Sequence, residues 1–349
     1  MRRGTRRRLG VLLLAAVLLG MGGGAAWASQ RVSRLMRDPA RPGSTRQVLV
    51  VVPRGSDLRQ ISTLLQSQGV VRSGLAFEWF VRRQHRSRSL EAGTYALGPG
   101  MTPGQILNLL VAGHVADRSV IVPEGWTATQ VISAFAAAGV GSPTQGLQAM
   151  QDVQLLAQAG LPAPGPGAKV ALEGYLFPAT YSFPPEWDAQ RAVQAMVQRF
   201  QQAWTPALQA AAAQQGLNTL QAVTLASIVQ REVTSPEDMT VVAGIYLRRL
   251  HMGMKLDADP TVLYGLGIQG QDGGLTAAEL ASSSPYNTYQ NAGLPPGPIC
   301  NPGLDALEAV AHPDTSGSAL YFLTAPSGQL VLADTLSQQL TNRQQYLGY

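Results

Sequence analysis

A strand, a glycine-containing turn and a helix follow one another three times between residues 46 and 141. The first copy is RQVLVVVPRGSDLRQISTLLQSQGVV, and RSVIVPEGWTATQVISAFAAAGVG repeats its proline, both glycines and its glutamine at the same offsets. A middle copy, YALGPGMTPGQILNLLVAGH, shares one glycine and the glutamine. Each copy changes from an extended apolar run to helical spacing at the turn. The copies are too short and too irregularly spaced for a solenoid, so the sequence predicts an α+β fold.

The turn of the first copy leaves two interpretations of equal weight. Ser56 or Asp57 is expected to cap the helix, and Gly69 to end it. The structural interpretation is a small α+β packing unit with glycines where the backbone needs positive φ. The functional interpretation is carbohydrate binding, because GSDLRQIS resembles the turn of LysM modules, which bind N-acetylglucosamine polymers. We therefore designate residues 47–141 a LysM-like region and expect a second, mixed α+β domain at 142–349.

The N-terminus predicts a membrane anchor. Residues 1–8, MRRGTRRR, precede an uncharged run at 9–29, LGVLLLAAVLLGMGGGAAWAS. That run is about long enough to span a bilayer as a helix. The arginines that precede it, within residues 1–8, favour a cytoplasmic amino end. A cleaved signal peptide is the alternative, because Ala26-Trp27-Ala28 is an acceptable cleavage site. We expect a cytoplasmic tail, a single-pass inner-membrane anchor, a polar linker at 30–46 and the remaining chain outside the cytoplasm.

Composition excludes several classes of function. The net charge is +5, and five arginines lie within the first eight residues, so the remaining chain is formally neutral. A nucleic-acid-binding body would need a basic surface, so no nucleic-acid partner is expected. The single cysteine, Cys300, excludes an intrachain disulfide. No metal site is predicted, because the four histidines lack metal-ligand spacing: His85, His114, His251 and His312.

One carboxylate is expected on the apolar face of a helix, where a charged residue is unusual. In LASIVQREV, residues Leu225, Ile228, Val229 and Glu232 are spaced as one face of a helix that should begin near residue 218 or 219. Desolvation on an apolar face would raise the pKa of Glu232 and keep the carboxyl protonated, as a general acid requires. The alternative is a structural glutamate near a helix end, paired with Arg231 or Arg249.

Other candidate residues come from segments before and after this helix. Asp259 could supply a second carboxylate, although Asp259-Pro260 also matches a helix cap. Candidate sugar contacts lie in SPYNTYQNAG, where aromatic rings can stack on pyranose faces and an amide can pair with an N-acetyl group: Tyr286, Asn287 and Tyr289. Glu173 opens the aromatic segment EGYLFPATYSFPPEW and could orient substrate or form a structural ion pair.

Five motifs resemble, in order and spacing, those of the endolytic murein transglycosylase (MltG/YceG-like) family. They are EGYLFPATY, SIVQREV, LDADPTVLYGLG, SPYNTYQNAGLPPGPICNPG, and ALEAVAHP followed by ALYFL. The resemblance implies that 142–349 is a catalytic domain with Glu232 as its catalytic acid. It implies cleavage of the MurNAc-β-1,4-GlcNAc bond inside peptidoglycan strands with a 1,6-anhydro product, no cofactor, and peptidoglycan synthases as possible partners. Gln230 stands where the family has a first acid, and Ala179 where it usually has aspartate.

Two rival functions remain at this level. The chain could be a non-catalytic peptidoglycan-binding or division-scaffold protein in which the repeats are the working part. It could also be a hydrolase that uses Glu232 together with Asp257 or Asp259, since a retaining hydrolase needs a second carboxylate about 5 Å away.

Overall fold

A computed structural model describes residues 34–113, 118–268 and 274–348. The chain forms two compact units. Among the described residues, the first contains 34–113 together with Pro184–Glu186, and the second contains 118–183, 187–268 and 274–348. The third strand–turn–helix copy therefore belongs to the second unit, whereas its sequence likeness groups it with the first two. The α+β prediction is confirmed.

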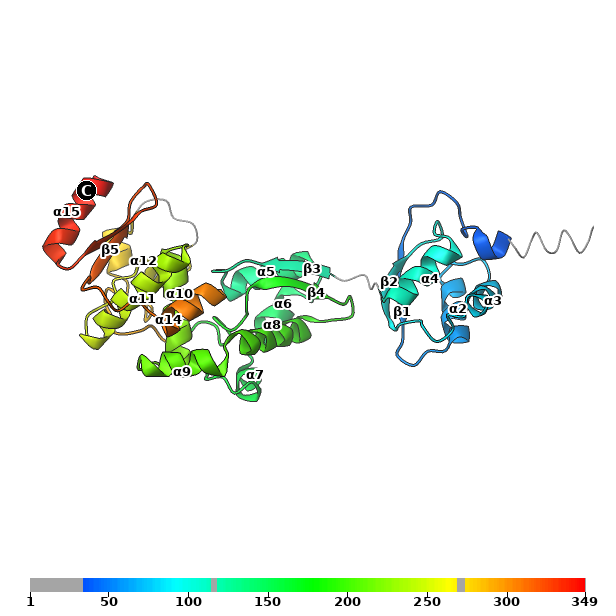
Figure 1. The fold of residues 1–349 in the computed structure, drawn as a ribbon, viewed down its shortest axis with the longest axis horizontal. Coiled ribbons are helices and arrows are strands. Elements are labelled where there is room, and N and C mark those ends of the chain that lie inside the picture. Colours follow the sequence, from blue (N-terminus) through cyan, green and yellow to red (C-terminus); the bar gives the residue numbers. More distant parts are fainter. Residues whose placement is uncertain (1–33, 114–117, 269–273, 349) are drawn as a thin grey trace, which may run out of the picture. The chain divides into compact units, whose positions relative to one another are not determined.

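The first unit surrounds a two-stranded antiparallel sheet. β1 (Val48–Val52) pairs with β2 (Gly93–Leu97), and Figure 1 shows helices α2 (Leu58–Ser67), α3 (Gly74–Arg83) and α4 (Pro103–Ala112) around it. Val50 and Val52 face the core, while Leu49 and Val51 are about half exposed. This alternation is the period of a half-buried strand.

The repeated glutamine has a structural role that its recurrence in the sequence did not reveal. In α2, α4 and α5 (Ala128–Ala137), the glutamine is the third helical residue and accepts a hydrogen bond from the backbone N–H of the cap residue. The cap side chain accepts from the glutamine N–H in return, and the caps are Asp57, Thr102 and Thr127. This reciprocal capping box satisfies two otherwise unpaired donors, which explains why the glutamine recurs.

The second unit contains two further antiparallel pairs and most of the helices. β3 (Arg118–Val122) pairs with β4 (Ala179–Phe183), and β5 (Tyr321–Thr324) pairs with β6 (Leu330–Ala333). Besides α5, the helices of this unit are α6 (Pro143–Ala149), α7 (Val153–Gln158), α8 (Ala189–Ala203), α9 (Pro206–Gln214), α10 (Thr219–Glu232), α11 (Pro236–His251), α12 (Asp259–Leu266), α13 (Ala277–Leu280), α14 (Leu304–Ala311) and α15 (Leu336–Leu347).

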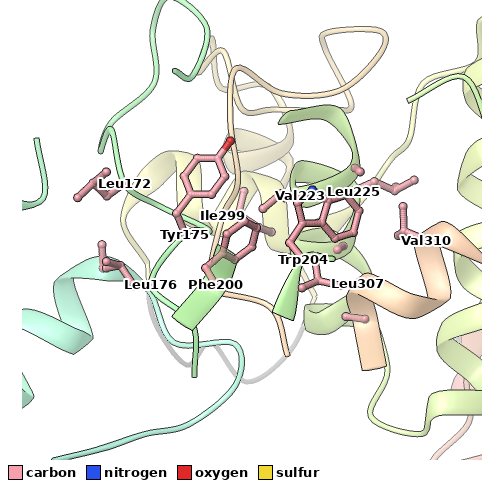
Figure 2. Close-up of a cluster of buried hydrophobic side chains, with 14 of the residues drawn as sticks. Leu172, Tyr175, Leu176, Phe200, Trp204, Val223, Leu225, Ile299, Leu307 and Val310 are labelled. Carbon is pink, nitrogen blue, oxygen red and sulfur yellow. The ribbon is translucent and has the colours of Figure 1, made fainter. Parts of the chain in front are cut away.

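The aromatic segment after Glu173 lies in the core of this unit. Figure 2 shows the Tyr175 ring beside Phe200, with the ring centroids 5.1 Å apart in an edge-to-face arrangement. Tyr175 and Leu176 are fully buried. At this end of the segment the residues therefore belong to the hydrophobic core, where Tyr175 packs against Phe200 of α8.

The predicted tail, the predicted anchor and the first linker residues, 30–33, lie outside the described residues. Within the described ranges, no helix is both long and apolar enough to cross a membrane.

Candidate active site

α10 begins and ends where the sequence predicts. Asn218 caps it through a capping box with Gln221, and Glu232 is its last residue. The eight residues from Ala222 to Val229 are all buried, so the helix is covered on every side rather than on one face. α9, α11, α12 and α14 pack against it. Glu232 is thus held at the end of a rigid central helix.

The Glu232 carboxyl is partly buried and accepts one strong side-chain hydrogen bond. The Tyr246 hydroxyl on α11 donates to its Oε1 across 2.9 Å. The pKa of Glu232 is raised to about 7, chiefly because burial desolvates the charged form. The bond from Tyr246 lowers this pKa, and the charge of Asp259 raises it. The carboxyl is consequently protonated over a much wider pH range than a solvated glutamate.

The alternative pairing of Glu232 with an arginine is not formed among the described residues. The Arg249 guanidinium donates to the carbonyls of Leu256 and Leu320, at 2.6 and 2.7 Å, and lies 3.4 Å from Asp257 Oδ2. Arg231 points toward the carbonyl of Gly125. The two arginines therefore bind backbone carbonyls and form no ion pair with Glu232.

A cavity of about 480 Å³ opens onto Glu232. Its polar lining comes from α10, α11 and the LDADP segment, and its opposite wall comes from β5 and α15. The polar lining includes Glu232, Tyr246, Asp257, Asp259 and Tyr289. Asp257 has a φ of 51°, a left-handed conformation that aspartate tolerates better than most residues and that is enriched at functional sites.

Asp259 and Tyr289 join Glu232 at this cavity. The Tyr289 hydroxyl donates to Asp259 Oδ1 across 2.6 Å, and burial raises the pKa of this tyrosine. The expectation that Asp259 caps α12 is wrong. Asp259 is the first helical residue, the cap position is Ala258, and no side chain caps this helix. The carboxylate is therefore available to the cavity.

Glu173 and Tyr286 lie together but not among the groups lining the Glu232 cavity. Glu173 is enclosed, and its Oε1 accepts from the Ala128 N–H across 2.8 Å. Its Oε2 accepts from the Tyr264 hydroxyl across 3.0 Å, and the Tyr286 ring packs edge-on against Tyr264. Burial raises the pKa of Glu173 to about 7 as well. Its carboxyl oxygens are occupied by the fold, which indicates a structural role.

Asn287, like Glu173, has a structural role. It is fully buried, and its Nδ2 donates to the carbonyls of Leu280 and Ser282 while its Oδ1 accepts from the Tyr289 N–H. These bonds use the amide that the sequence suggested for an N-acetyl group. They do position Tyr289 at the cavity.

Comparison with known proteins identifies the family. The YceG-like family matches residues 50–345. The chain belongs to the YceG-like family. It is 31% identical over 320 residues to a Bacillus subtilis (strain 168) protein named endolytic murein transglycosylase, covering 89% of this chain and 88% of that protein. A crystal structure of a YceG-like protein from Listeria monocytogenes has a TM-score of 0.59 and 30% identity, and covers 86% of this chain and 100% of that one.

A longer relative carries the same name. The endolytic murein transglycosylase of Streptococcus pneumoniae serotype 2 (strain D39 / NCTC 7466) is 30% identical over 309 residues. The match covers 82% of this chain but only 55% of that protein.

In this member of the YceG-like family, Gln230 points away from the Glu232 cavity. Its Oε1 accepts from the Gly303 N–H at the start of α14, across 2.8 Å, and its amide hydrogen-bonds the Glu124 carboxyl. A carboxylate at position 230 would face Glu124 with a like charge. The Gln230 amide can both accept and donate, so it connects α10 to α14 and to the turn that contains Glu124.

Tyr246 and α15 are the parts of the site that sequence reasoning missed. Tyr246 follows Glu232 by fourteen residues and reaches it only because α10 and α11 pack together. α15 presents Leu336, Gln339 and Arg343 to the cavity. Their spacing of three and four residues was a readable helical face, but nothing in the sequence indicated what that face covers.

Proposed function

We propose that the chain is an endolytic lytic transglycosylase that cleaves the MurNAc-β-1,4-GlcNAc bond within peptidoglycan strands. The carrying observation is the Glu232 carboxyl, which lines a cavity and has a pKa raised to about 7. The names of the curated relatives, each an endolytic murein transglycosylase, support the same substrate and reaction. The enzyme is a lyase in this assignment, since no water enters the product.

One carboxyl can perform both proton transfers of this reaction. Protonated Glu232 donates its proton to the glycosidic oxygen as the bond from muramic C1 breaks, and the GlcNAc-bearing fragment leaves with a hydroxyl. The resulting carboxylate then accepts the proton of the muramic C6 hydroxyl as its oxygen bonds to C1. This step closes the 1,6-anhydro ring and restores protonated Glu232. Tyr246 stabilises the carboxylate between the two steps through its hydrogen bond.

Glu232→Gln tests the proposal because glutamine keeps the shape but cannot transfer the proton. We expect a loss of turnover of at least about 100-fold on purified peptidoglycan, measured by mass spectrometry of 1,6-anhydro ends. Glu237→Gln is the matched control, because Glu237 is exposed on α11 and does not line the cavity. Unchanged turnover in Glu232→Gln would contradict the assignment.

A hydrolase is the second candidate, and Asp259 is the observation that favours it. Asp259 shares the cavity with Glu232, and its charge raises the pKa of Glu232, so the cavity holds the two carboxylates that a hydrolase requires. Cleavage in ¹⁸O-labelled water separates the reactions. A hydrolase incorporates the label and gives reducing ends, whereas a lytic transglycosylase gives unlabelled anhydro ends.

The remaining parts of the chain support a membrane-bound enzyme acting on glycan. We propose that residues 9–29 anchor it to the inner membrane, with the catalytic unit outside the cytoplasm and peptidoglycan synthases as neighbours. The GSDLRQIS turn supports a LysM-like glycan contact, because a hollow of about 450 Å³ is lined there by Val51, Pro53, Gly55, Ser56 and Gln60. A pull-down of the Glu232→Gln protein with insoluble peptidoglycan tests retention without turnover. A non-catalytic scaffold would bind equally but would release no fragments in wild-type form.

A further inference from the structure

A second and larger cavity, of about 700 Å³, lies beside the ends of the same two helices. Arg231 and Pro260 line it, whereas their chain neighbours Glu232 and Asp259 line the first cavity. Successive helical residues point about 100° apart, so each helix end can present one residue to each side. The two cavities therefore flank the place where the C-terminal end of α10 approaches the N-terminal end of α12.

Two cations line this cavity and have no carboxylate partner among the described residues. Lys169 Nζ donates to the Tyr264 carbonyl across 2.8 Å and lies 5.4 Å from the centre of the Tyr264 ring. Arg231 Nη1 donates to the Gly125 carbonyl across 3.4 Å. Both side chains are exposed, and an ammonium has three N–H donors and a guanidinium five. Each cation therefore keeps free donors toward the cavity.

The surroundings of the cavity add hydrogen-bonding groups. α5 begins at its wall, where the side chains of Thr127, Thr129 and Gln130 line the space. The N-terminus of α5 is already occupied, because the Ala128 N–H donates to the buried Glu173 carboxyl, and this carboxyl offsets part of the positive potential of Lys169 and Arg231. Its pKa is raised to about 7, so the offset is incomplete at neutral pH.

The substrate carries anions next to the bond that Glu232 would break. In peptidoglycan, the muramic ring whose C1 is attacked bears a lactyl group at C3, and the stem peptide attached there ends in free carboxylates. A stem that passes from the Glu232 cavity to the second cavity crosses the ends of α10 and α12, where Arg231 lines the second cavity. The charge of the second cavity and its position beside the Glu232 cavity thus both favour the stem peptide as its ligand.

We propose that this second cavity is a subsite for the stem peptide, in which Lys169 and Arg231 bind its carboxylates. The inference rests on the proposed function. It assigns the two cations a role in choosing which strands are cut, and it leaves the proton transfers to Glu232.

Kinetics on three substrates test the subsite. The substrates are uncross-linked strands with native stems, the same strands with stem carboxylates chemically amidated, and strands whose stems have been removed by an amidase, which leaves the lactyl carboxylate. For Lys169→Met and Arg231→Gln we expect KM to rise about tenfold on native stems with kcat nearly unchanged. On amidated stems, wild type and variants should have equal KM.

The controls separate binding from folding. Lys169→Arg should keep most of the wild-type KM because it retains the charge, and Arg199→Gln removes an exposed charge on α8 outside the cavity and should behave as wild type. Equal KM increases on native and amidated stems would overturn the subsite. A defect that persists on amidase-treated strands would assign the cations to the lactyl carboxylate and overturn the stem assignment. Failure of the proposed function is distinct, because then wild type would either cleave none of the substrates or release reducing ends in place of 1,6-anhydro ends.

Discussion

At the scale of single residues, two neighbours act in opposite directions on one proton. Tyr246 donates a hydrogen bond to Glu232 and favours the carboxylate, while Asp259 is a nearby negative charge that favours the protonated form. Burial is the largest influence and places the pKa near 7. The residue can therefore give up its proton and recover it near neutral pH, which a solvated glutamate cannot do.

The pH dependence of kcat/KM should reveal both neighbours. Since the proposed mechanism needs protonated Glu232 in the free enzyme, kcat/KM should fall as the pH rises through about 7. Tyr246→Phe removes a bond that lowers the pKa, so this fall should move to higher pH. Asp259→Asn removes a charge that raises the pKa, so the fall should move to lower pH. Shifts of about half a unit to one unit are expected, and shifts of both variants in the same direction would refute the assignment.

At the scale of elements, the turn before β4 holds several segments together. Asn301 Oδ1 accepts from the N–H groups of Gly174 and Leu176, at 3.0 and 2.9 Å, and Asn301 Nδ2 donates to the Trp126 carbonyl across 2.9 Å. Gly174 has a φ of 86°, and a Cβ there would collide with Pro298 and Val223. The family motif EGYLFP thus needs its glycine for backbone geometry and close packing.

Gly174→Ala should destabilise the catalytic unit. The left-handed backbone and the collision with Pro298 add, so we expect a loss of at least about 2 kcal/mol in the free energy of unfolding. Urea denaturation followed by fluorescence measures this loss. Gly160→Ala is the control, since Gly160 also has positive φ but a Cβ at that position would meet no atom within 4 Å. A loss no larger than that of the control would contradict the packing argument.

The local sequence predicted where helices begin, but it did not predict the contacts of Asp259 and Asn287. The cap at Asp57 and the start of α10 after Asn218 lie where the sequence places them, because a cap depends on residues within one helical turn. Asp259 also looked like a cap, but the Tyr289 hydroxyl, from a loop thirty residues later, holds its carboxylate at the cavity. Asn287 looked like a substrate contact, but carbonyls of its own loop occupy its amide.

At the scale of the whole molecule, two separate hydrophobic cores support the two units. One core contains Val50, Leu65 and Phe77, and the other contains Phe200, Leu225 and Val310. The residues that line the Glu232 cavity all belong to the second unit. The Glu232 cavity and the glycan contact proposed for the first unit therefore belong to units with separate hydrophobic cores.

Calorimetry should show this separation. Leu65→Ala removes a fully buried side chain from the first core and should destabilise only that unit, by about 2–5 kcal/mol. Phe200→Ala should act on the second unit alone, by about 3–5 kcal/mol. We expect two unfolding transitions, each shifted by one variant. A single transition shifted by both variants would show that the units unfold together.

The sequence by itself determined the α+β class and the helix that carries Glu232, and it singled out the acid on which the proposed mechanism rests. Those features depend on local spacing and on motifs that follow one another along the chain. The tertiary structure alone decided which residues meet that acid. Tyr246 comes from another helix, and Asp259 is held by Tyr289 across a loop. The packing around α10 also decided that the two arginines bind backbone carbonyls instead of Glu232. A pKa depends on burial and on neighbours in space, and neither quantity is written in the order of the residues.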